Sequence, residues 1–456
     1  MRSLLTPASA AIRATRAPSK PRRVNSVRAA AMSASLVGVD SYPASSVTPD
    51  RLPPTVRLTC QPYGCYVRRM PTTTPPATAR PALIRTGVLA AVGALPMVGQ
   101  LYIVLPLAAE IGALPGASTS THAFAGTVFA LAYAVGILAL GPLADSLGAR
   151  RLMVASAAAT AVVTALTALA PSASWFLLGR VARGVAAAAF TPAALAYIAR
   201  TAPVSARVPL NTAAIGAGLA SAVVSQVAAQ VIAPAAGLTG VFLTAAGAAA
   251  LAAAAIGTLL PGDAAPRGGG PSATAVHRAI PGLLRRPRLV LLYGTGLTFL
   301  SVLVALYTAL GADGRWSATT LLILRASSLP AVVVAGVLTL RLGEVPARTR
   351  ILGAVTLAVA GTLLCATGAT LAVGAGLFVF VGAVALAAPS VVAEVTRLGA
   401  PAIGAAASLY TVSIFGGASL GAPLDALFGG GLTTVAVGGA AVLAAGGLAA
   451  AIATRD

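Results

Sequence analysis

The chain has 456 residues, of which 57% are hydrophobic and only 9% are charged, and its formal net charge is +21. Soluble globular domains carry about 45–50% apolar and about 25% charged residues, so this composition excludes an ordinary soluble protein. A strongly basic chain can also indicate nucleic-acid binding, but the sequence has no patch that combines basic with aromatic residues, so we expect no nucleic acid as a partner.

Residues 1–80 form a basic leader rich in Ser, Thr, Pro, Ala and Arg, in which twelve basic residues are offset only by Asp40 and Asp50. The leader lacks the apolar core of about 7–15 residues that a secretory signal needs. We interpret it as a disordered tail, or as residues upstream of a start at Met70. Two alternatives stay open, an organelle transit peptide, which is typically rich in Arg and Ser and poor in acids, and a regulatory tail.

From residue 86 onward the chain is a series of apolar stretches of about 20 residues, the length that a helix needs to cross about 30 Å of hydrocarbon. Lipid cannot bond to exposed backbone groups, so these stretches are predicted to be helices. The predicted spans are 87–109, 123–144, 152–170, 175–199, 208–232, 238–260, 289–311, 318–340, 351–370, 372–394, 401–424 and 432–452. The ninth and tenth are separated only by a short segment near Gly368, so eleven spans is the alternative.

The distribution of arginine predicts the orientation, because cytoplasmic loops carry an excess of Arg and Lys. From Arg85 onward, alternate loops hold fifteen arginines, whereas the other set of loops holds only Arg315. This division requires twelve spans and places both termini in the cytoplasm. We expect a multi-pass protein of the plasma (inner) membrane, or of an organelle membrane if the leader is a transit peptide.

The loop 261–288, which is rich in Gly, Pro and Arg, divides the spans into two sets of six. Two segments of the first set align with the second, GPLADSLG at 141–148 with GVLTLRLG at 336–343, and TPAALAYIAR at 191–200 with APSVVAEVTR at 388–397. Parallel six-helix repeats are a recurring transporter plan, with the substrate site between the halves. We therefore predict a leader at 1–80, a first bundle at 81–260, a central cytoplasmic loop at 261–288 and a second bundle at 289–456.

The strongest local signal is GPLADSLGARR at 141–151, between the second and third spans. Gly141 allows close approach of a neighbouring helix, and Gly148 permits a tight turn. Asp145 lies at the end of a span, where a carboxylate can accept bonds from an arginine or from a helix N-terminus. Arg150 is placed to contact the cytosol and anionic headgroups.

This loop resembles the signature of the major facilitator superfamily, which reads roughly G-x-L-a-D-r-x-G-r-r, and it supplies Gly141, Leu143, Asp145, Gly148 and Arg150. It departs from the signature at Ser146 and Ala149, where the family usually has basic residues. The resemblance covers about residues 81–456. It implies an all-α membrane protein of twelve helices in two pseudo-symmetric six-helix bundles, in which Asp145 helps to hold the outward-open state.

The fourth predicted span contains Arg180 and Arg183 within apolar sequence. A charge at membrane depth is costly and normally faces a cavity or a partner, and residues three apart point to nearly one face of a helix. The pair resembles the R-x-x-Q-G motif of proton-coupled drug exporters of the superfamily, with Arg180 and Gly184 retained and Arg183 in place of the glutamine. That resemblance implies that Arg180 influences proton transfer or holds the network of the cavity. The alternative is a structural arginine that forms a salt bridge or snorkels.

The fifth span keeps Gly216 and Gly218 of the exporters' glycine-rich motif but lacks its Gly-Pro end. Because the Gly-Pro is missing, the sequence does not determine whether the chain works as an exporting antiporter. Gln226 and Gln230 are one turn apart and either share a cavity face or form helix–helix hydrogen bonds.

The remaining candidates for a substrate cavity are polar or aromatic residues within spans. Arg325 lies about eight residues into the eighth span and is the deepest charge of the second half. Each of the others is more often a packing or interface residue than a cavity residue. The full set of cavity candidates is Gln100, Tyr102, Gln226, Tyr293, Tyr307, Arg325 and Tyr410.

No Asp or Glu lies near the middle of a predicted span, although exporters of cationic drugs usually need a buried carboxylate. We therefore expect a neutral, amphipathic or anionic substrate. An enzyme is not expected, because the sequence has no phosphate-binding loop and no cluster of His, Cys and acids. Cys60 and Cys65 have no further ligand nearby, so we expect neither a metal nor another cofactor.

These observations predict a secondary active transporter working by alternating access, with proton-coupled efflux of a small amphipathic molecule as its function. The alternatives are uptake or exchange of an organic anion, and a non-transporting membrane scaffold or receptor. The expected partners are a small-molecule substrate, protons and the lipid bilayer, and we expect a monomer. Asp145, Arg180 and Arg183 are the predicted coupling residues.

Overall fold

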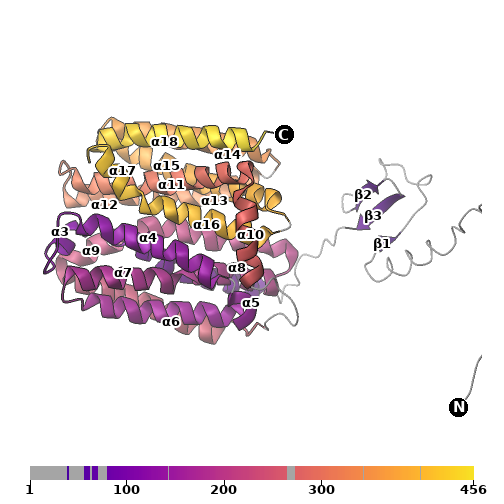
Figure 1. The fold of residues 1–456 in the computed structure, drawn as a ribbon, viewed down its shortest axis with the longest axis horizontal. Coiled ribbons are helices and arrows are strands. Elements are labelled where there is room, and N and C mark those ends of the chain that lie inside the picture. The colour runs from indigo at the N-terminus through magenta and orange to yellow at the C-terminus, as the bar shows by residue number, and fades with distance from the viewer. Residues whose placement is uncertain are drawn as a thin grey trace, which may run out of the picture. The chain divides into compact units, whose positions relative to one another are not determined.

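The computed structural model describes residues 39–40, 56–61, 64–69, 80–141, 143–263, 273–342, 344–400 and 402–455. The chain divides into two compact units, residues 1–77 and residues 78–456. The second unit contains all the predicted spans (Figure 1).

The first unit contains a small antiparallel sheet built from β1 (Val39–Asp40), β2 (Val56–Gln61) and β3 (Gly64–Arg69). The strand order is β1-β3-β2, and β2 and β3 form a hairpin in which Cys60 lies opposite Cys65. The composition of the leader did not predict these strands. Its predicted disorder otherwise concerns residues outside those that the structure describes.

The first half of the second unit begins with α2 and ends with α9. Its helices are α2 (Arg80–Tyr102), α3 (Ala108–Gly112), α4 (Thr121–Leu140), α5 (Leu143–Leu147), α6 (Ala149–Ala168), α7 (Ala173–Ala188), α8 (Phe190–Thr201) and α9 (Val204–Leu259). Within this half α2 and α6 pack against α9, and α4 packs against α7.

The second half begins with a short helix, α10, which precedes the spanning helices. Its helices are α10 (Ala273–Leu284), α11 (Pro287–Ala312), α12 (Ala318–Ala326), α13 (Leu329–Arg341), α14 (Ala347–Ala366), α15 (Thr370–Leu398), α16 (Ile403–Ser419), α17 (Gly421–Leu427) and α18 (Leu432–Ala453). Here α14 packs against α15 and α18, and α11 packs against α16 and α18.

The described helices account for twelve membrane crossings. Ten helical stretches are long and apolar enough to span a membrane, and α16 with α17 forms an eleventh that is bent by 40°. The stretch Ser205–Leu259 is two spans, because Gly237 has non-helical backbone angles (φ +61°, ψ −167°). Gly237 falls in the predicted gap between 208–232 and 238–260, so the twelve-span prediction agrees with the structure.

Besides the bent eleventh span, two spans are interrupted, and a proline explains each of these two interruptions. The fourth span is α7 followed by α8, and the eighth is α12 followed by α13. Proline has no N–H to donate to the carbonyl four residues earlier. Pro192 and Pro330 stand four residues after Ala188 and Ala326, which are the last residues of α7 and α12.

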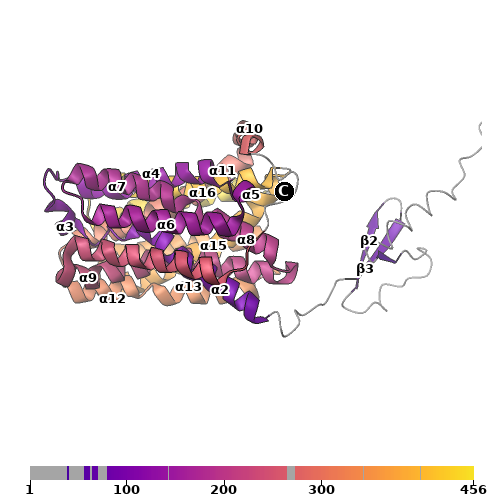
Figure 2. The same ribbon diagram turned by 90° about the horizontal axis from the view of Figure 1, so that it is seen from below.

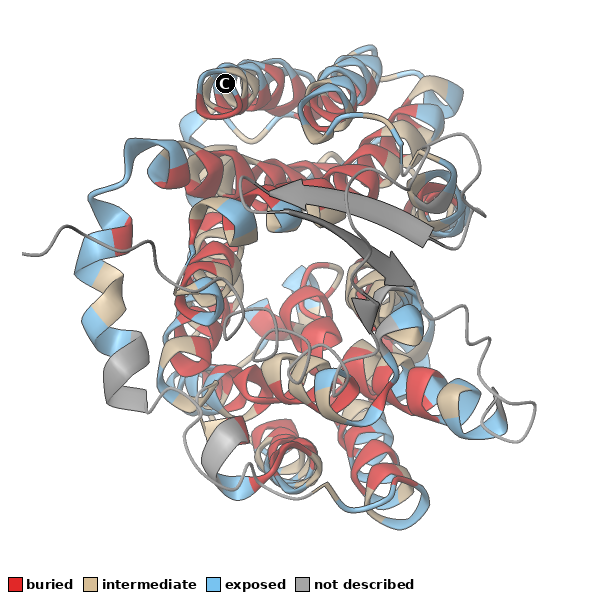
Figure 3. Cartoon of the chain, turned by 90° about the vertical axis from the view of Figure 1, so that its right-hand side faces the viewer, coloured by how far each residue is buried: buried red, intermediate tan, exposed pale blue. Residues whose placement is uncertain are grey.

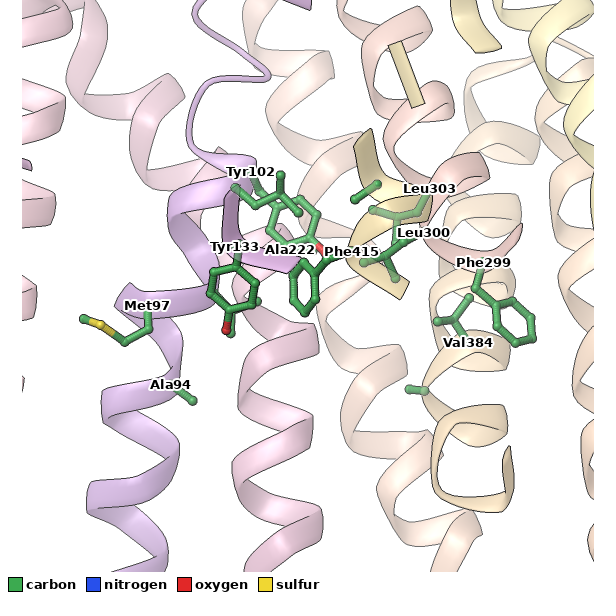
Figure 4. Packing of buried hydrophobic residues seen from close by; sticks show 14 of the residues in the cluster. Ala94, Met97, Tyr102, Tyr133, Ala222, Phe299, Leu300, Leu303, Val384 and Phe415 are labelled. Carbon is green, nitrogen blue, oxygen red and sulfur yellow. The ribbon is translucent and has the colours of Figure 1, made fainter. Parts of the chain in front are cut away.

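Buried residues gather inside the bundle of the membrane unit, as Figure 3 shows, and they are a mainly apolar core with a smaller set of polar and charged side chains. Many large apolar side chains are exposed on the outside. Leu371 is 90% exposed and Leu251 is 72% exposed, which suits a lipid-facing surface. The halves meet where α4 contacts α16 and where α9 contacts α12 and α13. Tyr102, Tyr133 and Phe415 lie together in this interior, and the Tyr133 and Phe415 ring centroids are 4.3 Å apart (Figure 4).

Candidate functional site

The loop that carries the GPLADSLGARR motif is built as a short helix between two turns. α4 ends at Leu140 with Gly141 as its C-cap, α5 covers the middle of the motif, and α6 begins at Ala149. Gly148 precedes α6 with φ +86°, a backbone region that favours glycine. Asp145 belongs to α5, but its side chain lies outside the described part of the chain, so its role in the outward-open state stays a prediction.

A different acid holds this loop. The Asp263 carboxylate accepts hydrogen bonds from the backbone N–H groups of Ala149 and Arg150, both at 2.9 Å, and caps the N-terminus of α6. It also forms a 3.0 Å ion pair with Arg200, at the end of α8. The Arg200 guanidinium donates a second bond of 2.8 Å to the carbonyl of Ala144.

Arg150 is part of the same connection, because its guanidinium donates to the carbonyl of Gly257 in α9. The loop is therefore tied to the ends of the fourth and sixth spans. Sequence reasoning did not single out Asp263. The available signal was an isolated acid directly after a span, in a segment where the other charged residues are all arginine.

Arg180 is fully buried in α7 and is bound by backbone carbonyls. Its guanidinium donates to the carbonyl of Ala125 at 2.8 Å and to that of Gln100 at 2.5 Å, with Leu101 at 3.5 Å. α2 ends at Tyr102, so its last carbonyls lack the usual helical partner. Arg180 occupies two of these acceptors and joins the fourth span to the first and second.

Arg183 is also fully buried, but its three guanidinium nitrogens have no hydrogen-bond partner among the described residues. Its guanidinium carbon lies 4.2 Å from the centre of the Phe242 ring in α9. Arg180 makes a similar contact with Phe129 at 4.5 Å. The prediction that both arginines point inward agrees with their burial, and within the described chain neither forms an ion pair.

Arg325 lies in α12 and is only 2% exposed. It donates to the side-chain oxygen of Gln230 in α9, so the bond crosses from one half to the other. Gln230 also donates to the carbonyl of Ala318 at 2.5 Å. Nearby, Tyr307 and Ser328 share a hydrogen bond of 2.8 Å, and Ser328 donates to the carbonyl of Arg325 at 3.0 Å.

We call this contact region, with Thr127 of α4 and Ser419 of α16, the closed end. The Thr127 hydroxyl donates to the carbonyl of Ser419 at 3.1 Å, a second bond between the halves. The residues of the closed end are Thr127, Gln230, Ala318, Arg325 and Ser419.

The other predicted cavity residues do not gather in one place. Gln226 donates to the carbonyl of Ala222 in its own helix. Gln230, in contrast, bonds to Arg325 in the other half. Tyr410 packs against Gly296 in the second half, and Tyr293 belongs to the same buried cluster. Gln100 lines an apolar cavity of about 170 Å³ between α2 and α9, with its side-chain oxygen unpartnered.

A larger cavity of about 550 Å³ lies between the halves, toward the end where α8 and α10 lie. Its walls are mainly Ala, Val, Leu, Gly and Pro from α9, α13 and α15, and none of its described lining residues is charged. The polar exceptions include Asn211, whose side-chain oxygen is buried without a hydrogen-bond partner. None of the cavity candidates from the sequence lines this cavity.

Residues 90–423 match the sequence profile of the Major Facilitator Superfamily. The chain belongs to the major facilitator superfamily. This confirms the resemblance drawn from the loop motif and the fold of two six-helix bundles.

Two known proteins are similar to this superfamily member. A stretch of 131 residues is 38% identical to the multidrug efflux pump LfrA of Mycolicibacterium smegmatis, and it covers 27% of this chain and 25% of the pump. The crystal structure of the nucleoside transporter NupG is similar with a TM-score of 0.64 and 14% sequence identity, covering 82% of this chain and all of that chain. The second likeness concerns the fold alone.

Proposed function

We propose that the chain is a secondary active transporter that exports a small, uncharged and largely apolar organic molecule by alternating access. The observation that carries this proposal is the 550 Å³ cavity between the halves, which is walled by apolar residues and has no charged residue in its described lining. Ligand sites are typically apolar clefts of about 300–1,000 Å³ with a few polar groups. The Asn211 side-chain oxygen is such a group, and it favours a substrate with one hydrogen-bond donor.

The contacts between the halves support alternating access. The closed end joins the halves through Gln230 with Arg325 and through Thr127 with Ser419, while the cavity lies toward the other end. The arginine-rich loops lie on the cavity side, so the orientation predicted from the sequence places the cavity toward the cytoplasm. The partial likeness to an efflux pump supports export as the direction.

We propose further that transport is coupled to protons. Arg180 has a partner set made of carbonyls, which favours a structural role for this residue.

A second candidate is uptake or exchange of an organic anion. Arg180, Arg183 and Arg325 are buried, and none of them forms an ion pair with a described residue. Buried positive charges without an ion-pair partner favour an anionic ligand near them. Against it, none of the three lines the large cavity.

The test is flux into proteoliposomes with an imposed pH gradient, using a panel of neutral amphipathic molecules, an organic anion, a nucleoside and a permanently cationic dye. We expect gradient-dependent flux for neutral members and a weaker response to the dye. Asn211→Leu should reduce the flux of donor-bearing substrates, while Asn211→Gln should retain part of it. An absence of gradient-dependent flux across the whole panel would sink the proton-coupled proposal.

A further inference from the structure

The helix α10 lies across the direction of the spanning helices. Figures 1 and 2 show it at the end of the bundle where α5, α8 and the C-terminus lie, at the outer edge of the ring of spans. α11 begins at Pro287, three residues after α10 ends at Leu284. α10 is therefore placed at the level where a span enters the membrane, beside the bundle and parallel to the membrane surface.

One side of α10 packs on the protein. Leu283 is only 2% exposed, and Ala279 and Ile280 are partly buried in the same cluster of the second half. α10 contacts α11 and α16 through this side. The contact fixes which side of the helix faces away from the bundle.

The opposite side is basic. Arg278 is exposed and lies five residues before Leu283, which places it about 140° around the helix from the packed side. Arg285, directly after the last residue of α10, is also exposed. Leu284, beside them, is 51% exposed. Arg288 is exposed at the start of α11, whereas Arg286 donates to the carbonyls of Leu398 and Ala400, at 2.7 and 3.0 Å.

The sequence around this side contains no compensating acid. Residues 264–288 include five arginines and neither Asp nor Glu. An amphipathic helix with a basic polar side and exposed apolar residues is typical of a helix that lies in the membrane interface. Clusters of Arg or Lys next to a span attract the anionic lipids of a membrane surface.

We propose that α10 and the start of α11 bind the anionic phospholipid headgroups of the adjoining leaflet through Arg278, Arg285 and Arg288. Leu284 lies at the acyl boundary and Leu283 holds the helix on the bundle. The bound headgroups fix the connection between the two halves at the membrane surface. The proposal concerns binding alone and does not depend on the transported molecule.

The test is retention of lipid by the purified full-length protein, counted by native mass spectrometry after incubation with equal amounts of phosphatidylcholine and phosphatidylglycerol. We expect the triple variant R278Q/R285Q/R288Q to retain at least threefold less phosphatidylglycerol, with phosphatidylcholine unchanged. The triple lysine variant R278K/R285K/R288K keeps the charge and should retain phosphatidylglycerol. This result separates loss of charge from a failure to fold.

The matched control is R341Q/R348Q/R455Q, which removes three exposed arginines at the same end of the bundle but away from α10. Its phosphatidylglycerol retention should stay within a factor of 1.5 of the unsubstituted protein. An equal loss in the control would show a general attraction and would overturn the assignment to α10. Displacement of the lipid by millimolar inorganic phosphate would also overturn it, because it would indicate a site for free anions.

Discussion

Among the described residues of the membrane-spanning unit, three arginines are buried, and each has a different environment. Arg180 binds carbonyls at the end of α2 and in α4, and Arg325 bonds to Gln230 in the other half. Among the described residues, the group that contacts the Arg183 guanidinium and could stabilise its charge is the aromatic face of Phe242. Burying a charge without hydrogen bonds is costly. Substitutions of these arginines should therefore change the stability of the protein by different amounts and in different directions.

We expect Arg180→Met to lower the thermal stability of the purified protein, because it leaves the carbonyls at the end of α2 without a donor. Arg183→Met should be neutral or stabilising, because it removes a buried charge that has no hydrogen-bond partner in the described part of the chain. A thermal-shift assay of the two variants in the same detergent gives the comparison. Equal destabilisation by both would show that Arg183 has a partner of comparable strength.

The carboxylate of Asp263, which follows the sixth span, joins the motif loop to the end of the fourth span. Asp263→Ala removes an N-cap and a 3.0 Å ion pair, and loss of an N-cap alone costs about 1 kcal/mol. We expect a lower melting temperature for Asp263→Ala and a smaller decrease for Asp263→Asn, which keeps one acceptor. The control is Glu344→Gln, an exposed acid at the same end. A loss as large in the control would contradict the role of Asp263.

At the scale of elements, small residues decide how closely the helices approach. Gly361 of α14 and Gly376 of α15 are in backbone contact, and a Cβ on Gly361 would lie 2.7 Å from the Gly376 carbonyl oxygen. Small residues at such crossings allow the packing that holds helices together in lipid.

Gly361→Leu should therefore separate α14 from α15 and strongly reduce the yield of folded protein. Gly353→Leu is the matched control, because Gly353 lies in the same helix with open space where a Cβ would be built. Size-exclusion profiles and melting temperatures of the two variants test the expectation. If Gly353→Leu lowered stability as much, the loss would come from placing a leucine anywhere in α14 and not from separating α14 and α15 where they cross.

At the scale of the whole molecule, alternating access requires the halves to separate at the closed end. A cysteine pair at Thr127 and Ser419, in a chain whose native cysteines are replaced, should form a disulfide because these residues are in contact. Oxidation should abolish transport, and a reductant should restore it. The bond would hold the halves in one state.

The control pair is Ser156 with Ala186, which are in contact within the first half. A bond there should leave transport intact, because this half moves as one body in the proposed mechanism. Unimpaired transport by the oxidised Thr127–Ser419 pair would exclude separation of the halves at this point.

The sequence alone determined the membrane class, the number of spans and the family. Spans are read from local composition, because lipid imposes the same requirement on each segment. The inward position of Arg180 and Arg183 was also predictable, since helical spacing and the cost of an exposed charge act locally. The predicted cytoplasmic termini stay a prediction.

Only the tertiary structure decided which groups meet. The bond between Gln230 and Arg325 joins residues 95 positions apart, and the cavity at Asn211 is walled by three helices from both halves. In a sequence composed so largely of Ala, Val, Leu and Gly, many helix faces are chemically alike. Their partners are therefore decided by the shape of the packed bundle, which no local pattern records.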